Sequence, residues 1–167
     1  MILVALGSNL ESAGFGGPRQ TLEAALDVMP SYGIAVIRKS SWYSSAPVPT
    51  SSQPWFVNGV ICVETSVGPS DLLAKLHAIE ERFGRKRIRK NECRTLDLDL
   101  LAFGESRLAV QQGLMLPHPR IAERAFVLQP IDEIAPAWRH PVTGETAADM
   151  LSRLPGQQRI RRLGTTS

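Results

Sequence analysis

Short apolar runs alternate with amphipathic stretches along this chain, and the order of the two patterns predicts its fold. Apolar runs rich in β-branched and aromatic residues, each bounded by glycine, proline or serine, are typical of strands. Apolar residues three and four positions apart are typical of helices. The predicted strands are Ile2 to Leu6, Ile34 to Tyr43, Phe56 to Thr65, Leu96 to Phe103 and Leu108 to Val110, the last two as a candidate hairpin. The predicted helices are 19–29, 69–83, 119–124 and 144–154, the last capped by Thr146.

The first hundred residues follow the order β-α-β-β-α-β. This order is typical of a ferredoxin-like domain, in which helices cover one face of an antiparallel sheet. The expected fold class is therefore α+β, with a short C-terminal extension after the ferredoxin-like core. Since no repeat, low-complexity tract or linker divides the chain, residues 1–167 are expected to form a single domain. The last few residues are expected to be loosely held.

Composition excludes several other classes of protein. The 167 residues are 43% hydrophobic and 21% charged, which is typical of a globular protein and not of a disordered or fibrous one. The longest apolar runs have about six residues, too few to span a bilayer. Met1 to Leu6 lacks the basic start and cleavage site of a signal peptide. Cys62 and Cys93 form no disulfide framework, so a cytoplasmic location is expected.

The basic residues are concentrated in one short segment. Between Arg82 and Arg94 there are seven basic residues and one acidic residue, a net charge of +6, whereas the rest of the chain has 12 basic and 15 acidic residues, a net charge of −3. A local positive field of this kind indicates a polyanionic partner. A solvated basic loop and a nucleic-acid surface are the alternatives, although the segment lacks the aromatic residues of a single-strand stacking platform.

Two aspartates follow this segment on a predicted strand. Asp97 and Asp99 share one face of that strand, about 7 Å apart by strand rise, while leucines occupy the other face. Two like charges raise each other's energy, and a divalent cation removes that cost. Carboxylate oxygens favour Mg²⁺, which in proteins commonly also binds substrate phosphates. The adjacent basic residues favour this hypothesis over the alternative of a solvated acidic edge, because a magnesium–triphosphate complex needs both groups.

Three more polar residues occupy unusual positions. Glu80 falls inside the apolar stripe of its predicted helix, so it either pairs with a nearby arginine or contacts a ligand. Asn58 shares a strand face with Phe56, an arrangement that suits a flat heterocycle, although a sheet-edge asparagine bonded to backbone is the commoner case. His118, between two prolines, is a candidate phosphate contact, although most single loop histidines have no such role.

Together these features resemble the 6-hydroxymethyl-7,8-dihydropterin pyrophosphokinase family of folate biosynthesis. The resemblance extends over about residues 1–136. Its most specific block is Arg94-Thr-Leu-Asp97-Leu-Asp99-Leu-Leu. The other matching motifs, in chain order, are Gly7-Ser8-Asn9-Leu10, Ser41-Trp42-Tyr43, Pro54-Trp55-Phe56-Val57-Asn58, Ile79-Glu80, Gly84-Arg85-Lys86-Arg87, Pro117-His118-Pro119-Arg120 with Arg124 and Phe126, and the stretch from Pro130 to Pro136.

The resemblance implies a monomer that transfers the terminal two phosphates of ATP as one unit to the hydroxymethyl oxygen of the pterin, releasing AMP. It implies two Mg²⁺ ions on Asp97 and Asp99, and no nucleic-acid or membrane partner. With these aspartates, Arg85 and Arg94 are the implied catalytic residues. The implied nucleotide contacts are His77, Glu80, Arg85, Arg87, Arg94, His118 and Arg124, and the implied pterin contacts are Ser45, Pro47, Val48, Phe56, Asn58 and Phe126.

The chain departs from the family at Lys90-Asn91-Glu92-Cys93, where the family usually has arginine-tryptophan-glycine-proline. The loops 11–18, 44–54 and 84–93 are expected to close over the substrates and exclude water. Two other functions are compatible with parts of the sequence. An RNA-binding ferredoxin-like module would use the basic segment and the C-terminal arginines but leaves the aspartates unexplained. Another magnesium-dependent small-molecule kinase would release ADP instead of AMP.

Overall fold

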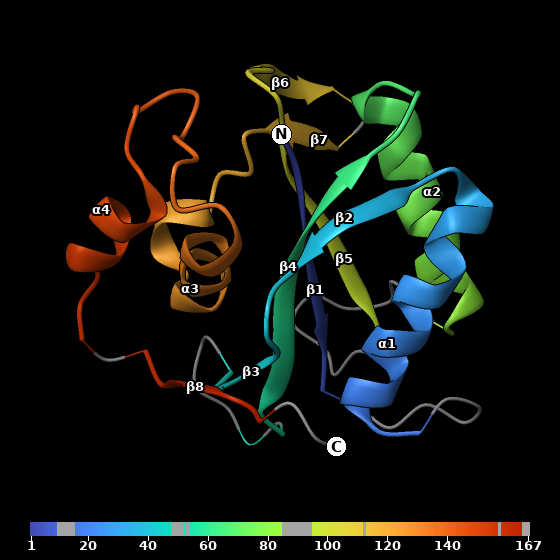
Figure 1. Cartoon of the computed structure of the whole chain (residues 1–167), viewed down its shortest axis with the longest axis horizontal. Helices are drawn as coiled ribbons and strands as arrows, with labels where there is room; N and C mark the ends of the chain where they lie inside the picture. Colours follow the sequence, from blue (N-terminus) through green and yellow to red (C-terminus); the bar gives the residue numbers. More distant parts are fainter. Residues whose placement is uncertain are drawn as a thin grey trace.

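The computed structural model describes residues 1–9, 16–47, 52, 54–84, 95–111, 113–156 and 158–164. In this part of the chain, strands form a central antiparallel sheet with helices on both sides (Figure 1). The strands are β1 (Ile2–Ser8), β2 (Ala35–Lys39), β3 (Tyr43–Ser45), β4 (Phe56–Glu64), β5 (Asp97–Phe103), β6 (Leu108–Gln111), β7 (Leu114–Leu116) and β8 (Ile160–Arg162). The helices are α1 (Pro18–Val28), α2 (Pro69–Arg82), α3 (Ala125–Ile134) and α4 (Ala147–Ser152), with 3-10 turns at Met29–Tyr32 and Ile121–Glu123.

The long strand β4 organises the sheet. One edge of β4 pairs with β1, which in turn pairs with β5. The other edge of β4 pairs with β2 along one half and with β3 along the other half, and β3 pairs with β8. Within the described ranges the sheet order is therefore β5-β1-β4-β3-β8, with β2 also beside β4. An antiparallel sheet packed with helices confirms the expected α+β class.

Helices cover both faces of the sheet, whereas the sequence predicted helices on one face only (Figure 1). Val4 and Leu6 of β1 pack with α1 and α2 in one hydrophobic cluster. Leu3 of β1 and Val60 of β4 pack with α3 and α4 in a second cluster on the opposite face. The continuous apolar run of β1 follows from this double burial, because a strand covered on both faces has no solvent-facing positions.

The predicted strand from Ile34 to Tyr43 is interrupted, and forms β2 and β3 as separate strands. The backbone N–H of Ser40 donates to the carbonyl oxygen of Val60, and the Ser40 hydroxyl accepts from the N–H of Val60. This interruption turns the ring of Trp42 into the core, where it lies against Gly59. A Cβ on Gly59 would lie 2.6 Å from that ring, so only glycine lets the indole pack there.

The second half of the chain differs from the prediction in two places. The strand starting at Leu108 pairs with β7 in a separate two-stranded sheet and not with β5. The predicted helix 119–124 is a 3-10 turn, and the longer helix α3 that follows it was not predicted. Pro130 lies within α3, and a proline inside an apolar stretch argues against a continuous helix when only the sequence is considered.

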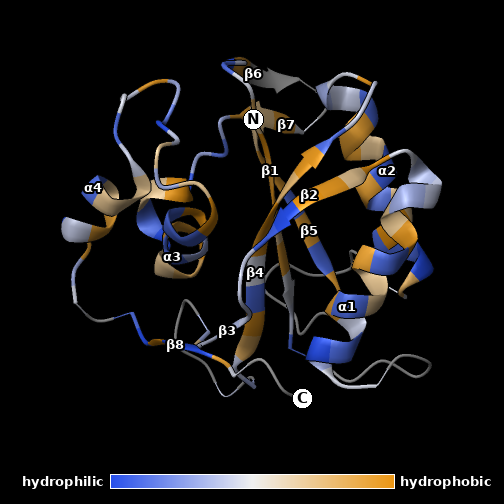
Figure 2. Ribbon diagram, viewed as in Figure 1, coloured by the Kyte–Doolittle hydropathy of each residue, from blue (hydrophilic) through white to orange (hydrophobic). Residues whose placement is uncertain are grey.

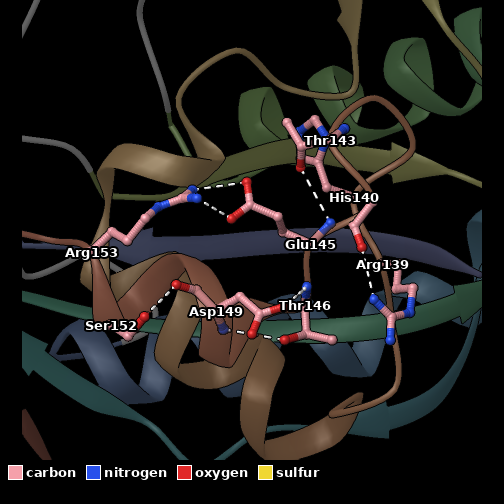
Figure 3. Close-up of polar contacts among 9 residues, drawn as sticks. Arg139, His140, Thr143, Glu145, Thr146, Asp149, Ser152 and Arg153 are labelled. Atoms are coloured by element: carbon pink, nitrogen blue, oxygen red, sulfur yellow. Dashed lines mark hydrogen bonds and ion pairs between the residues drawn. The ribbon is translucent and has the colours of Figure 1, made fainter.

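The short helix α4 was predicted, together with its cap. Thr146 Oγ1 accepts from the N–H of Asp149, and the Asp149 carboxylate accepts from the N–H of Thr146 (Figure 3). This reciprocal pair satisfies two backbone donors at the start of the helix. Arg153 pairs with Glu145 beside it.

Hydropathy follows the layers of the fold. The strands at the centre of the sheet are largely in hydrophobic colours, whereas α1 and α2 alternate hydrophilic and hydrophobic turns (Figure 2). Among the described residues, no helix combines the length and apolar character that crossing a bilayer would require.

Candidate active site

Strand β5 carries the two aspartates on one face, as the alternation in the sequence predicted. Leu96, Leu98 and Leu100 are buried in the cluster with α1 and α2. Asp97 and Asp99 therefore lie on the opposite face, the one that α3 covers, and both side chains are half-buried. The geometric part of the prediction is confirmed.

Small residues of β1 stand opposite the aspartates. Asp97 pairs with Gly7 and Asp99 pairs with Ala5 in the β1–β5 register. On the other side of β1, Gly7 pairs with Asn58 of β4. Paired residues of neighbouring antiparallel strands point to the same face of the sheet, so the register brings the aspartates and Asn58 onto one surface. Only small side chains separate them.

Arg124 and His118 complete this surface. Arg124 is the residue that precedes α3, and burial lowers its pKa while the nearby carboxylates of Asp99 and Asp97 act in the opposite direction. His118 is also half-buried, and its backbone N–H donates to the carbonyl oxygen of Leu101 on β5. Both side chains thus lie close enough to the aspartate pair to interact with it electrostatically.

His118 is neutral at physiological pH in this environment. Burial, followed by the charges of Arg124 and Arg120, lowers its pKa to about 4, with Asp97 acting in the opposite direction. The Nδ1 atom of His118 accepts a hydrogen bond from the N–H of Arg120 at 3.1 Å. The proton of the neutral ring is therefore on Nε2, which can donate to an oxygen atom of a ligand.

The residues implied for pterin binding lie next to the aspartates on the same face. Asn58 is buried, and its amide nitrogen donates to the hydroxyl oxygen of Ser45 on β3. Because β4 has partners on both edges, Asn58 is not a sheet-edge residue. Phe56 is half-buried two residues before Asn58, and Pro47 is buried just after β3.

Phe126 approaches this surface from α3. The Cζ atom of Arg124 lies 5.5 Å from the centroid of the Phe126 ring, a cation–π distance. Phe126 is half-buried and packs against the hydrophobic cluster on the α3 side of the sheet. The residues implied for the pterin and for the phosphates therefore meet where α3 begins.

Glu80 of α2 approaches β5 from the other face of the sheet. Glu80 is only 1% exposed, and its Oε2 atom accepts a hydrogen bond at 2.8 Å from the N–H of Leu98, the residue between the two aspartates. This contact accounts for a carboxylate in the apolar stripe and favours a structural role. His77 is half-buried one turn earlier.

Four of the implied site residues lie outside the described residues: Val48, Arg85, Arg87 and Arg94. Residues 90–93, where the sequence departs from the family pattern, also lie outside the described residues. Within the described ranges, the aspartate pair is not joined by a third His, Cys, Asp or Glu in a metal-ligating cluster.

Sequence reasoning missed two features of this site. The first strand was predicted to end at Leu6, whereas β1 continues to Ser8 and contains Gly7, and a glycine inside a strand often marks the close approach of another group. Gln158 gave no signal at all. Its side chain hydrogen-bonds to the residues on either side of Arg124, and these two contacts span 33 and 35 positions in the chain.

Comparison with known proteins gives one consistent family. Residues 3–136 match the model of the family described as 7,8-dihydro-6-hydroxymethylpterin-pyrophosphokinase (HPPK). A Pseudomonas aeruginosa protein named 2-amino-4-hydroxy-6-hydroxymethyldihydropteridine pyrophosphokinase is 41% identical over 157 residues, which cover 92% of this chain and 91% of that protein. A Synechocystis protein of the same name is 39% identical over 153 residues, covering 91% and 75%.

Longer proteins also match. The folic acid synthesis protein fol1 of Pneumocystis carinii is 35% identical over 92% of this chain, which spans only 20% of the length of fol1. The crystal structure of Plasmodium falciparum HPPK-DHPS with pteroate superimposes with a TM-score of 0.70 at 14% identity, covering 90% of this chain and 43% of that one. This structural likeness supports the fold alone.

Proposed function

Since the chain belongs to the 7,8-dihydro-6-hydroxymethylpterin-pyrophosphokinase (HPPK) family, we propose that it transfers the terminal pyrophosphoryl group of ATP to 6-hydroxymethyl-7,8-dihydropterin and releases AMP. The observation that carries the proposal is the surface made by Asp97, Asp99, Arg124 and Asn58. It combines carboxylates for a cation, a guanidinium for phosphate, and a buried amide for a heterocycle.

The aspartate pair fits Mg²⁺. Both groups are hard oxygen ligands on one face of β5, and two protein carboxylates leave coordination positions for phosphate oxygens and waters. We assign two Mg²⁺ ions to Asp97 and Asp99. When bound, the metal ions would neutralise phosphate charge and polarise the β-phosphoryl group. Arg124 and the neutral His118 would bind phosphate oxygens from the α3 side.

We further propose that the pterin lies between Phe56 and Phe126 and hydrogen-bonds to Asn58. Support comes from the position of both rings on the α3 side of the sheet and from the fixed amide of Asn58, which Ser45 orients. Ser45, Pro47 and Val48 would line the edge of the heterocycle. The support is the hydrogen bond between Ser45 and Asn58 and the burial of Pro47 just after β3.

The basic segment completes the nucleotide site in this proposal. Arg85, Arg87 and Arg94 would bind the triphosphate, with Arg85 and Arg94 acting on the charge that shifts during transfer. The support is their place in the +6 segment immediately before the aspartates. His77 and Glu80 would lie near the nucleotide, and the hydrogen bond from Leu98 supports a positioning role for Glu80.

In the reaction, the hydroxymethyl oxygen of the pterin attacks the β-phosphorus of ATP. The bond from the β-phosphorus to the oxygen bridging it to the α-phosphorus breaks, AMP leaves with that oxygen, and the hydroxyl proton passes to solvent. Catalysis here consists of positioning and charge neutralisation. The side chains of this surface hold the two substrates in line and bind charge that moves toward the leaving oxygen.

The proposal includes a ferredoxin-like core, for which the order β5-β1-β4 with β2 beside β4 is the support. It also includes a monomer acting in the cytoplasm on two small molecules, without nucleic acid.

The test is incubation with ATP, Mg²⁺ and 6-hydroxymethyl-7,8-dihydropterin, followed by nucleotide analysis. We expect AMP to form in proportion to pterin consumed. Asp97→Ala and Asp99→Ala should each abolish AMP release with the fold retained, whereas Asp27→Ala, at an exposed position of α1, should leave it unchanged. ADP as product would indicate a different kinase, and salt-sensitive RNA binding without turnover would favour the nucleic-acid alternative. Normal turnover by either site variant would refute the site.

A further inference from the structure

The C-terminal segment 158–163 lies against the candidate active site, although it is outside the residues that match the family model. Ile160, Arg161 and Arg162 pair with β3, the strand that carries Ser45. The N–H of Leu163 donates to the carbonyl oxygen of Trp42, so the pairing continues past the strand. The segment thus pairs with β3, which lies next to Asn58 of β4, and forms the edge strand β8 of the sheet.

Gln158, at the start of this segment, is hydrogen-bonded to the beginning of α3. Its Oε1 atom accepts a hydrogen bond at 2.7 Å from the N–H of Ala125. Its Nε2 atom donates at 2.6 Å to the carbonyl oxygen of Glu123. Helix α3 has no side-chain cap of its own, so the amide of Gln158 satisfies one of the free donors at its first turn.

These two hydrogen bonds bracket Arg124. The backbone of Arg124 is extended, between a 3-10 turn and the helix, and both of its chain neighbours are held by the same amide group. The guanidinium group of Arg124 lies against the Phe126 ring and close enough to Asp97 and Asp99 for their charges to interact. The direction of the Arg124 side chain therefore depends on the backbone that Gln158 fixes.

The next residues of the segment hold Gln158 in place from the opposite side. The guanidinium of Arg159 lies 5.2 Å from the centroid of the Trp55 ring, and its carbonyl oxygen accepts from the N–H of Ala46. Trp55 is 41% exposed and immediately precedes Phe56. Arg162 also lies 3.5 Å from Glu133 of α3. The segment consequently joins the pterin side of the site, on β3 and β4, to the phosphate side, at α3.

We propose that Gln158 is a positioning residue, which clamps the 123–125 backbone so that Arg124 points at the triphosphate beside the aspartate pair. The inference rests on the proposed function, because it acts through Arg124 on a bound nucleotide. Loss of the clamp leaves Arg124 chemically intact but lets its backbone move. Small misplacement of a group that binds phosphate is costly in rate, so the effect appears in nucleotide binding and turnover.

The experiment uses the full chain and four variants: Gln158→Ala, Arg124→Ala, the double variant, and Arg153→Ala as a matched control. Arg153→Ala removes the ion pair between Glu145 and Arg153, the residue that follows α4 (Figure 3). Neither hydrogen bond of Gln158 involves Arg153. Affinity for the α,β-methylene analogue of ATP with Mg²⁺ is measured, together with AMP release and Tm. The analogue has no cleavable α–β phosphate bridge.

We expect Gln158→Ala to weaken analogue binding about fivefold and to slow AMP release about tenfold, with Tm lowered by only about 3 °C. Arg153→Ala should remain within about twofold of wild type. In the Arg124→Ala background, Gln158→Ala should add less than about twofold, because a residue that acts through Arg124 has nothing left to position.

Two results would overturn the inference while leaving the proposed function intact: wild-type binding and turnover in Gln158→Ala, or the same loss in both backgrounds, which would indicate a purely structural role. A wild-type chain that releases no AMP under these conditions would instead overturn the proposed function, and the clamp with it.

Discussion

Gly7 on β1 stands directly opposite Asn58 on β4, and a Cβ built on Gly7 would lie 3.0 Å from the Oδ1 atom of Asn58. The absence of a side chain at this position lets the buried amide keep its hydrogen bond to the hydroxyl of Ser45. A glycine inside a strand lowers stability through backbone entropy. At Gly7 this loss of stability is the consequence of leaving room for the closely packed amide of Asn58 in the proposed pterin site.

Gly7→Ala should therefore raise KM for the pterin about tenfold, because the added methyl group displaces the Asn58 amide from its position. Affinity for the nucleotide should change less than about twofold, since Gly7 lies toward the pterin side of the aspartates. Steady-state kinetics with each substrate varied in turn measure both effects. Gly164→Ala, where a Cβ meets no atom within 4 Å, is the matched control. An unchanged pterin KM would contradict the proposed role of Asn58.

Glu80→Ala should destabilise the fold by about 1–3 kcal/mol, because the buried N–H of Leu98 loses its acceptor. Activity should fall as well, since Leu98 lies between the two aspartates. Glu80→Gln keeps an acceptor oxygen and should lose less stability. Chemical denaturation with AMP assays measures both quantities. Glu81→Ala, at the exposed neighbouring position of α2, is the control. A free energy of unfolding of Glu80→Ala equal to that of wild type would show that this hydrogen bond does not contribute to stability.

His118 should titrate near pH 4, well below the ordinary value of 6.5, because burial and the charges of Arg124 and Arg120 lower its pKa. The lowered pKa in the folded state means that acidification below about pH 6.5 destabilises the protein, since the unfolded chain binds the proton first. NMR titration of the His118 ring, assigned with His118→Gln, measures the midpoint. A midpoint close to 6.5 would place the ring in water and away from Arg124.

Glu133 should contribute more stability at neutral pH than in acid. Burial alone would raise its pKa, but hydrogen bonds from Tyr43 and Ser41 and the charge of Arg162 outweigh it and hold the pKa below the ordinary 4.5. A carboxylate with a lowered pKa stabilises the fold above its unfolded value and loses that contribution as the pH falls through the folded value.

The Tm difference between wild type and Glu133→Gln should therefore be largest near about pH 7 and shrink below about pH 4. Thermal unfolding over this range measures it. Glu64→Gln, on an exposed position of β4, is the matched control for loss of a carboxylate. A difference that stays constant with pH would mean that the carboxylate charge of Glu133 has no part in its contacts.

Which side chains around β5 share a face was predictable from the sequence, because the alternation of side chains along a strand is a local property. The leucines and aspartates of Leu96 to Leu100 had to fall on opposite faces whichever strand lay beside them. Capping of α4 by Thr146 was equally local, since both partners lie within one turn. The place of Glu80 inside an apolar stripe was also evident, although its partner was not.

The identity of neighbouring strands was not predictable in the same way. Whether β6 pairs with β5 or with β7, and whether α3 covers the second face of the sheet, depends on contacts between residues far apart in the chain. Pro130 even argued against the helix that the core stabilises, because tertiary burial outweighs local propensity.

By itself, then, the order of residues determined which side chains share a strand face, where charge is concentrated, and which family the motifs resemble. Only the tertiary structure decided that Gly7 leaves room for Asn58, that Glu80 reaches the backbone between the aspartates, and that Gln158 brackets Arg124. The physical reason is the distance along the chain over which each kind of interaction acts. Periodicity and capping act within a few residues, whereas these three contacts form only when the sheet register and helix packing bring distant segments together.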